Sequence, residues 1–272
     1  MDNNIELIML GTGNAAVTKC YNTCFALKYH NEYMLVDAGG GNGILVQLEK
    51  AGISLKNIHT LFLTHAHTDH LLGAIWIIRA IAQLKQKQAY DGTLTIYAHD
   101  KVIHVIDWIC RNTLPAKIVA HIGHTIQFSE VKDGDQFEAL ASHFTCFDIF
   151  STKEKQFGFT STLVNGQTLT CLGDEPYNER TESYVRNSNW LMAEAFCLYR
   201  DRDQFKPYEK HHSTALDAGK TAQELSIDNL ILFHTEDKTI ETRKETYTAE
   251  ATEFFKGNVY VPEDLESIII KA

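Results

Sequence analysis

The chain has 272 residues, of which 44% are hydrophobic and 22% are charged. This balance suits a folded domain with a core and excludes an intrinsically disordered chain. The formal net charge of −10 argues against a generic nucleic-acid binder, so a nucleic-acid substrate would need a local basic patch or a metal. No signal peptide is readable, and the most apolar stretch, Leu71 to Ala82, is too short to cross a bilayer. We expect a soluble, cytoplasmic protein with no membrane partner, whose six cysteines are reduced and buried.

Strand and helix patterns alternate along the chain. Runs of β-branched and apolar residues predict strands at 5–10, 23–29, 33–37, 60–64, 93–98, 142–147, 158–164, 168–172, 191–196, 229–233, 258–261 and 267–270. Helical spacing predicts helices at 43–51, 70–86, 101–111, 214–225 and 242–255. Thr214 with Asp217 has the form of a capping box. The order favours one domain over residues 1–272, in two β-rich halves of about 1–133 and 134–272 that are each covered by helices.

The segment His65-Ala-His67-Thr-Asp69-His70 places four metal-ligand side chains within a short loop. An apolar strand-like run precedes it and a helical run follows it, so the side chains can converge where a strand ends. Imidazole and carboxylate groups suit zinc, manganese and iron. His65 and His67 can reach one metal, and Asp69 and His70 can reach a second, at the spacing of a two-metal hydrolytic site.

This motif resembles the HxHxDH signature of the metallo-β-lactamase superfamily, and the resemblance, which covers nearly the whole chain, is closest to ribonuclease Z. It extends to further motifs, which are Leu10-Gly11-Thr12-Gly13, Val36-Asp37-Ala38-Gly39, Leu172-Gly173-Asp174, Ala193-Glu194-Ala195-Phe196, His212-Ser213-Thr214-Ala215 and Leu232-Phe233-His234-Thr235. The resemblance implies an α/β fold, the four-layer αββα metallo-β-lactamase sandwich. It also implies that Asp174 bridges two metals and that His234 completes the second one.

The sequence contexts of these residues support the same roles independently of the resemblance. Asp174 follows an apolar strand and a glycine, and His234 follows a buried-strand run; a turn aspartate and a core histidine are the alternatives. Glu194 lies in an otherwise apolar strand, where an unpaired carboxylate is costly. Pairing with His212 would offset that cost and form an acid–base couple that protonates a leaving alkoxide. An edge-strand glutamate beside a loop histidine is the alternative for this couple.

One ligand of the family pattern is missing. The family has a histidine shortly before a Gly-Phe or Gly-Tyr pair, and here no histidine lies between Phe147 and Gly158. By spacing, the position falls near Phe150. Asp148 shares its strand face, because side chains alternate along a strand, and we expect Asp148 to be the replacement ligand. His143, or a water with Asp148 capping a turn, are the alternatives.

Two further departures concern the substrate. Tyr21 stands where ribonuclease Z has an arginine in a loop near its start, and nothing in residues 148–189 has the Gly/Pro-rich composition of the family's tRNA-gripping arm. Both departures, with the acidic charge, argue against tRNA processing.

We therefore expect a metal-dependent hydrolase, namely a ribonuclease Z-like phosphodiesterase or phosphoester hydrolase. In the expected reaction a metal-bound hydroxide attacks phosphorus, Asp69 orients or deprotonates the water, and Glu194 with His212 assists the leaving group. Two divalent ions are expected, zinc first, with manganese or iron as alternatives. The phosphoester substrate is a small molecule or a nucleic acid, and a homodimer is an open option. Two other functions stay open, a lactone or thioester hydrolase and a non-catalytic metal-binding domain. Fold alone does not name a substrate.

Overall fold

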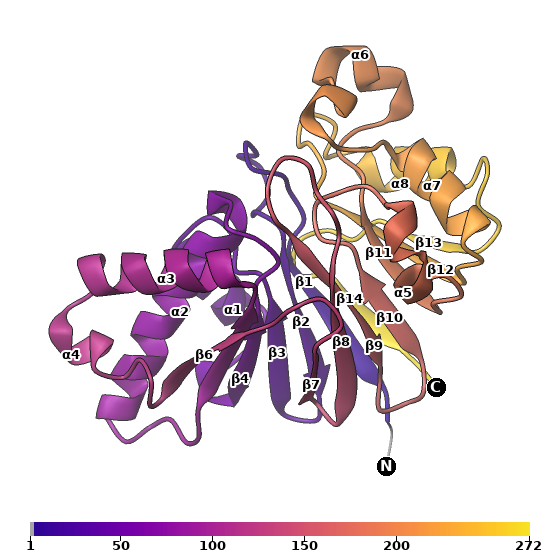
Figure 1. Ribbon diagram of the computed structural model, residues 1–272. Coiled ribbons are helices and arrows are strands. Elements are labelled where there is room, and N and C mark those ends of the chain that lie inside the picture. Colours follow the sequence, from indigo (N-terminus) through magenta and orange to yellow (C-terminus); the bar gives the residue numbers. More distant parts are fainter. Residues whose placement is uncertain (1–2) are drawn as a thin grey trace.

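The computed structural model describes residues 3–272. Within this range two seven-stranded sheets lie face to face, and helices cover their outer faces (Figure 1). The four-layer αββα sandwich expected from the sequence is thereby confirmed.

The first sheet has the strand order β14-β1-β2-β3-β4-β5-β6. Its strands are β1 (Ile5–Gly11), β2 (Cys24–Tyr29), β3 (Glu32–Val36), β4 (Ile58–Phe62), β5 (Leu94–Ala98), β6 (Ile126–Glu130) and β14 (Ser267–Ile270). Strands β3 to β6 are parallel to one another. Their carboxyl ends therefore share one edge of the sheet, where ligands usually bind in such sheets.

The second sheet has the order β13-β12-β11-β10-β9-β8-β7. Its strands are β7 (Gln136–Ala139), β8 (Ser142–Asp148), β9 (Phe157–Thr162), β10 (Thr168–Cys171), β11 (Trp190–Glu194), β12 (Asn229–Phe233) and β13 (Asn258–Tyr260). Strands β10 to β13 are parallel, so this sheet also gathers its strand ends at one edge.

Helices cover each sheet on its outer side. The first half carries α1 (Gly43–Lys50), α2 (Thr68–Gln86), α3 (Asp100–Thr113) and α4 (Ala116–Val119), and the second carries α5 (Glu182–Val185), α6 (Arg202–Phe205), α7 (Ala215–Glu224) and α8 (Arg243–Ala251). Short 3₁₀ turns lie at Leu55–Asn57, Glu179–Thr181, Tyr199–Asp201 and Tyr208–Lys210. The capping box at the start of α7 is present, because Thr214 and Asp217 each accept a backbone N–H of the other.

Three apolar layers hold the four structural layers together. One lies between the first sheet and α1 to α3, one between the two sheets, and one between the second sheet and α5, α7 and α8. Strand alternation supplies them: Ile231 and Phe233 of β12 face the other sheet, whereas Leu230 and Leu232 face the helices. Both faces of such a strand are buried, which explains its continuous apolar run.

The sequence patterns missed two strands and the path of the last one. Strands β6 and β7 lie at sheet edges, where polar residues interrupt the apolar pattern that marks a strand. The chain changes sheets between them, in the 131–135 segment expected to divide the halves. Strand β14, however, pairs with β1 and returns the carboxyl terminus to the first sheet.

All six cysteines are free; five are buried and Cys20 is half-buried. No helix within residues 3–272 is long and apolar enough to cross a membrane. A cytoplasmic location stays a prediction.

Candidate metal centre

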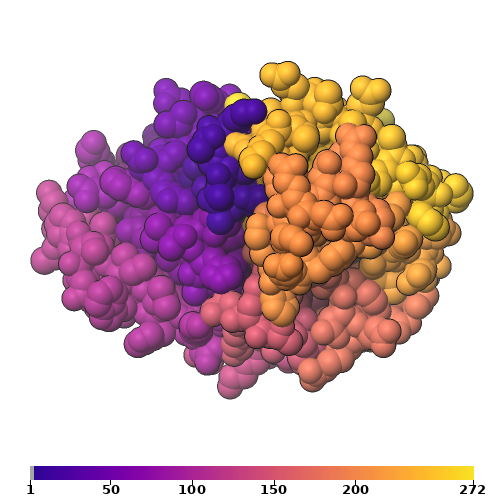
Figure 2. Space-filling view, turned by 90° about the horizontal axis from the view of Figure 1, so that it is seen from above, coloured from indigo at the N-terminus to yellow at the C-terminus, as the bar shows by residue number. Residues whose placement is uncertain are grey.

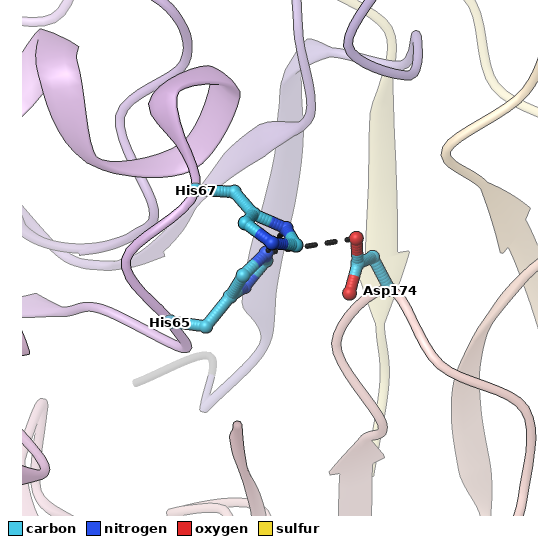
Figure 3. Close-up of side chains that lie close together, drawn as sticks. All are labelled: His65, His67 and Asp174. Atoms are coloured by element: carbon cyan, nitrogen blue, oxygen red, sulfur yellow. Dashed lines mark hydrogen bonds and ion pairs between the residues drawn. The ribbon is translucent and has the colours of Figure 1, made fainter. Parts of the chain in front are cut away.

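The side chains of the sequence motif meet where the carboxyl edges of the two sheets face each other. His65 and His67 lie in the loop after β4, and Asp69 and His70 lie in the first turn of α2. Asp174 comes from the other half, after β10, and points at His65 and His67 (Figure 3). His234 follows β12 directly. Seen from above, the orange segment around residue 200 lies against the indigo amino-terminal segment (Figure 2).

Two groups of ligand atoms share Asp174. His65 Nε2 lies 2.9 Å from His67 Nδ1 and 3.6 Å from Asp174 Oδ2. In the second group, Asp69 Oδ2 lies 3.4 Å from His70 Nε2 and 3.6 Å from His234 Nε2. Asp174 Oδ2 also lies 3.7 Å from His234 Nε2. The geometry therefore matches two adjoining cation sites with a carboxylate between them.

Several buried ligand atoms of the cluster lack a hydrogen-bond partner within residues 3–272, as expected for atoms that bind a metal. His70 Nε2, His234 Nε2 and Asp174 Oδ1 are buried and have no hydrogen-bond partner among the described residues. A buried polar atom without a partner is costly. The ligand atoms of Asp69, His70 and His234 lie within 4.8 Å of one another, as do those of His65, His67 and Asp174. The buried atoms would regain the lost energy by binding a divalent cation.

Asp37, which sequence reasoning did not assign to the site, orients two of the histidines. Its carboxylate accepts hydrogen bonds from Thr64 N (2.8 Å), Thr64 Oγ1 (2.8 Å) and His70 Nδ1 (2.6 Å). Thr64 Oγ1 in turn lies 2.9 Å from His65 Nδ1. With their Nδ1 atoms held in this way, His65 and His70 direct Nε2 toward the cation sites, an arrangement that metal-ligating histidines commonly show.

Two site residues adopt the left-handed backbone region that non-glycine residues rarely occupy. The φ angles are 55° at Asp37 and 56° at His234. Such conformations cost about 1–3 kcal/mol each and persist only where the surrounding structure enforces them. Both residues directly follow the last residue of a strand, and the turn places the side chain of Asp37 against His70 and that of His234 against Asp69 and Asp174.

The electrostatics of the cluster favour the ligand form of Asp69, Asp174 and His65. Burial raises the pKa of Asp69, but the neighbouring imidazoles of His234 and His70, at 3.6 and 3.4 Å, outweigh it and hold that pKa well below its usual range. Burial likewise opposes ionisation of Asp174, and the neighbouring histidines lower its pKa well below the ordinary value. Burial lowers the pKa of His65 far below its usual value. Ionised carboxylates and a neutral imidazole are the forms that coordinate metal.

Glu194 and His212 lie together, as the sequence pattern predicts. Glu194 ends β11 and is buried; its Oε1 accepts a hydrogen bond from Ser213 N (2.5 Å). Its Oε2 faces His212 Nδ1 at 3.6 Å, and neither atom has a hydrogen-bond partner among the described residues. Burial raises the pKa of Glu194 to about 8 and lowers the pKa of His212 to about 3. At neutral pH the pair therefore stores its proton on Glu194.

The structure does not bring Asp148 to the cluster, contrary to the expectation from strand alternation. Strand β8 ends at Asp148, whose Oδ1 accepts a hydrogen bond from Phe150 N (2.7 Å). Phe150 has a φ of 58°, so the chain turns away and the strand face no longer continues. His143, the alternative ligand, is exposed and pairs with Glu138 at 3.2 Å.

A different residue of that segment reaches the site. Lys153 Nζ lies 3.5 Å from His212 Nε2 and 3.4 Å from Glu175 Oε1. The sequence offered no signal for this residue, because a lysine in a polar loop ordinarily points into solvent. Beside it lies a cavity of about 300 Å³ whose wall includes Glu175, Tyr177, Tyr208 and His212.

The chain is similar to a known protein family and to several solved structures. Residues 5–253 match the model of the family described as "Anti-Pycsar protein Apyc1". The ribonuclease Z of Thermococcus sibiricus is 24% identical over 307 residues, covering 97% of this chain and 96% of the relative. The metallo-beta-lactamase fold protein YhfI from Bacillus subtilis has a TM-score of 0.78 at 17% identity, covering 98% of this chain and 99% of its own. Human tRNase Z, short form, has a TM-score of 0.74 at 19% identity, covering 97% and 98%. The fold is thus that of the metallo-β-lactamases.

Proposed function

The chain belongs to the Anti-Pycsar protein Apyc1 family and is a metal-dependent phosphoester hydrolase of the ribonuclease Z type, and we propose that its substrate is a small phosphodiester. The observation that carries the proposal is Asp174 between two ligand groups, with the Glu194–His212 couple beside them. Two adjoining metal sites can hold a phosphate from both sides, and a proton donor next to them can protonate an alkoxide leaving group.

We propose two divalent ions, of which zinc fits the histidine-rich ligands best. His65, His67 and Asp174 would hold one, and Asp69, His70, His234 and Asp174 the other. When bound, such ions lower the pKa of a coordinated water and offset the charge of phosphate oxygens. The orphaned buried atoms of His70, His234 and Asp174 support this proposal.

The protein's own residues divide the proton transfers. Asp69 is ionised and buried against His70 and His234, so its carboxylate is the group that accepts or orients the proton of the attacking water. On the leaving side, the P–O bond breaks with its electron pair on oxygen, and His212 Nε2–H gives that oxygen a proton. His212 Nδ1 takes the proton stored on Glu194 Oε2, which leaves the imidazole neutral and Glu194 as a carboxylate.

Three features favour a small substrate over tRNA. The cavity beside His212 has a volume of about 300 Å³, the low end for a small-molecule site. Tyr21 is half-buried, and its hydroxyl donates toward the carbonyl oxygens of Ala38 and Gly41 (3.0 Å each), so it contributes no cation for a phosphate backbone. The net charge of −10 opposes the long-range attraction on which nucleic-acid binding depends.

We also propose that the chain forms a homodimer. Trp76 of α2 and Trp108 of α3 are 39% and 60% exposed, and large exposed aromatic residues commonly mark a protein interface. Sedimentation of Trp108→Glu beside the wild type tests this, and unchanged monomeric sedimentation of the wild type would contradict it.

A substrate panel tests the main proposal. Zinc- or manganese-reconstituted protein is assayed on bis(p-nitrophenyl) phosphate, p-nitrophenyl phosphate, a lactone and precursor tRNA, with Asp69→Ala as the inactive reference. We expect turnover of the diester well above that of the other three. Turnover of the lactone alone, or accurate cleavage of precursor tRNA, would replace the proposal by another substrate class.

A further inference from the structure

The segment that connects β8 to β9, residues 151–156, contacts both halves of the molecule; we name it the strap. Ser151 Oγ donates to Glu175 Oε1 (2.8 Å) and fixes the strap to the second half. Lys155 Nζ pairs with Asp100 Oδ1 (2.5 Å) at the start of α3 and fixes it to the first. The strap ends at Gln156, whose side chain is fully buried. Anchored on both sides, the strap holds the backbone of Lys153 beside the metal centre.

The ammonium group of Lys153 has three contacts, and all of them are long. Nζ lies 3.3 Å from Lys210 O, 3.4 Å from Glu175 Oε1 and 3.5 Å from His212 Nε2. Charge-assisted hydrogen bonds between an ammonium and an oxygen are usually about 2.7–2.9 Å long. The other paired lysine of the strap, Lys155, reaches such a bond at the surface, whereas Lys153 keeps hydrogen-bonding capacity unused.

The Lys153 ammonium group lies between residues of the metal centre and residues that line the cavity. Its partner His212 lies with its ring centroid 5.2 Å from that of His234, and its partner Glu175 directly follows the shared ligand Asp174. Both partners also line the cavity of about 300 Å³. The side chain is 20% exposed, so part of it is accessible beside these two cavity-lining partners.

We infer that Lys153 is a substrate-binding residue whose ammonium group donates a hydrogen bond to a non-bridging oxygen of the phosphate. This inference rests on the proposed phosphoester chemistry and deepens it. The phosphate oxygen replaces the long contacts to His212 and Lys210, and His212 Nε2 is then directed to the leaving oxygen. A pairing role with Glu175 alone is a weaker account, because Ser151 Oγ already donates to the same Glu175 oxygen at a shorter distance.

Binding of inorganic phosphate tests the inference without turnover. Calorimetric titration of metal-loaded wild type, Lys153→Met, Lys153→Arg and Lys244→Met is accompanied by metal analysis and thermal unfolding of each. Lys244→Met is the matched control, since it removes a surface lysine that is paired with Glu266 (2.7 Å) and lies outside the strap. We expect Lys153→Met to raise the Kd for phosphate about 10- to 100-fold, the value of one charge-assisted hydrogen bond, and Lys153→Arg to recover most of the affinity.

Turnover adds a second readout. Because a non-bridging oxygen is the same in all substrates, Lys153→Met should lower kcat/KM on aryl phosphodiesters by a similar factor whatever the leaving group. An unchanged phosphate Kd in a folded, metal-loaded Lys153→Met protein, or an equal loss in Lys244→Met, would overturn the inference. If the wild type binds phosphate through Lys153 but hydrolyses no phosphodiester, the proposed function fails and the inference stands.

Discussion

The Glu194–His212 couple predicts a loss of activity that depends on the leaving group. Replacing Glu194 by Gln keeps an oxygen that accepts the Ser213 N–H and places an amide N–H against His212 Nδ1, where the 3.6 Å contact now lies. The Ser213 hydrogen bond and the His212 contact can therefore persist, but the amide cannot give up a proton. Only the proton transfer to the leaving oxygen is removed.

The size of the effect follows from the pKa. With a pKa of about 8, Glu194 holds its proton in about nine molecules out of ten at pH 7. Positioned general acids contribute about 10²- to 10⁴-fold to rates. We expect Glu194→Gln to lower kcat by about this factor on a methyl phenyl phosphodiester, and by less than about fivefold on the p-nitrophenyl analogue, whose leaving group needs no proton.

The assay is a series of methyl aryl phosphodiesters that differ in the acidity of the phenol, with Glu250→Gln as the control. Glu250 also accepts backbone N–H groups through its carboxylate, from Tyr199 and Leu216, and it has no contact with the metal ligands. The dependence of log kcat on phenol acidity should steepen in Glu194→Gln and stay parallel to the wild type in Glu250→Gln. A uniform loss across the series would refute the general-acid role.

Four further outcomes are expected. Elemental analysis of reconstituted protein should give two divalent metals per chain, and a sample without bound transition metal would contradict the ligand assignment. Asp69→Ala should remove most activity while circular dichroism stays that of the wild type; a retained kcat would exclude the role of this carboxylate. Asp37→Ala should weaken metal binding about 10- to 100-fold, as measured by competition with a chelating dye, and an unchanged affinity would show that His65 and His70 need no such support. In metal-free protein the folded state keeps the Glu194 proton between pH 4.5 and about 8, so the free energy of unfolding of the wild type falls as pH rises through that range. Urea unfolding at pH 5.5 and 9 should therefore show Glu194→Gln becoming more stable relative to the wild type at the higher pH. If the stability difference between the two proteins is the same at both pH values, the pKa of Glu194 is not raised.

The strand ends that carry the ligands could be predicted from the sequence because local and tertiary signals agree there. Strand β12 was predicted with its observed bounds, 229–233, since a strand with both faces buried is apolar throughout. A polar residue directly after such a run, such as His234, is then placed at the shared edge of a parallel sheet. The same reasoning located His65 and Asp174 without knowledge of the packing between the sheets.

The support around the ligands could not be predicted in this way. Asp37 follows a strand just as Asp174 does, and its sequence context does not distinguish a residue that coordinates from one that orients histidines. The distinction depends on the left-handed turn at Asp37 and on the position of Thr64, which comes from the neighbouring strand. Edge strands β6 and β7 were missed for a related reason, because their polar residues are tolerated only where the sheet ends.

The segment without the family histidine shows how one backbone angle changes the chemistry. Extrapolation along β8 placed a carboxylate, Asp148, at the vacant ligand position, and an added negative charge there would favour manganese or iron over zinc. The turn at Phe150, with its φ of 58°, is a conformation that bulky side chains rarely adopt, so no sequence pattern predicts it. The turn leaves Asp148 to cap its own loop and brings an ammonium, Lys153, beside the site instead. Without a carboxylate at that position the ligands are mainly imidazoles, and imidazole-rich sites suit zinc rather than harder ions.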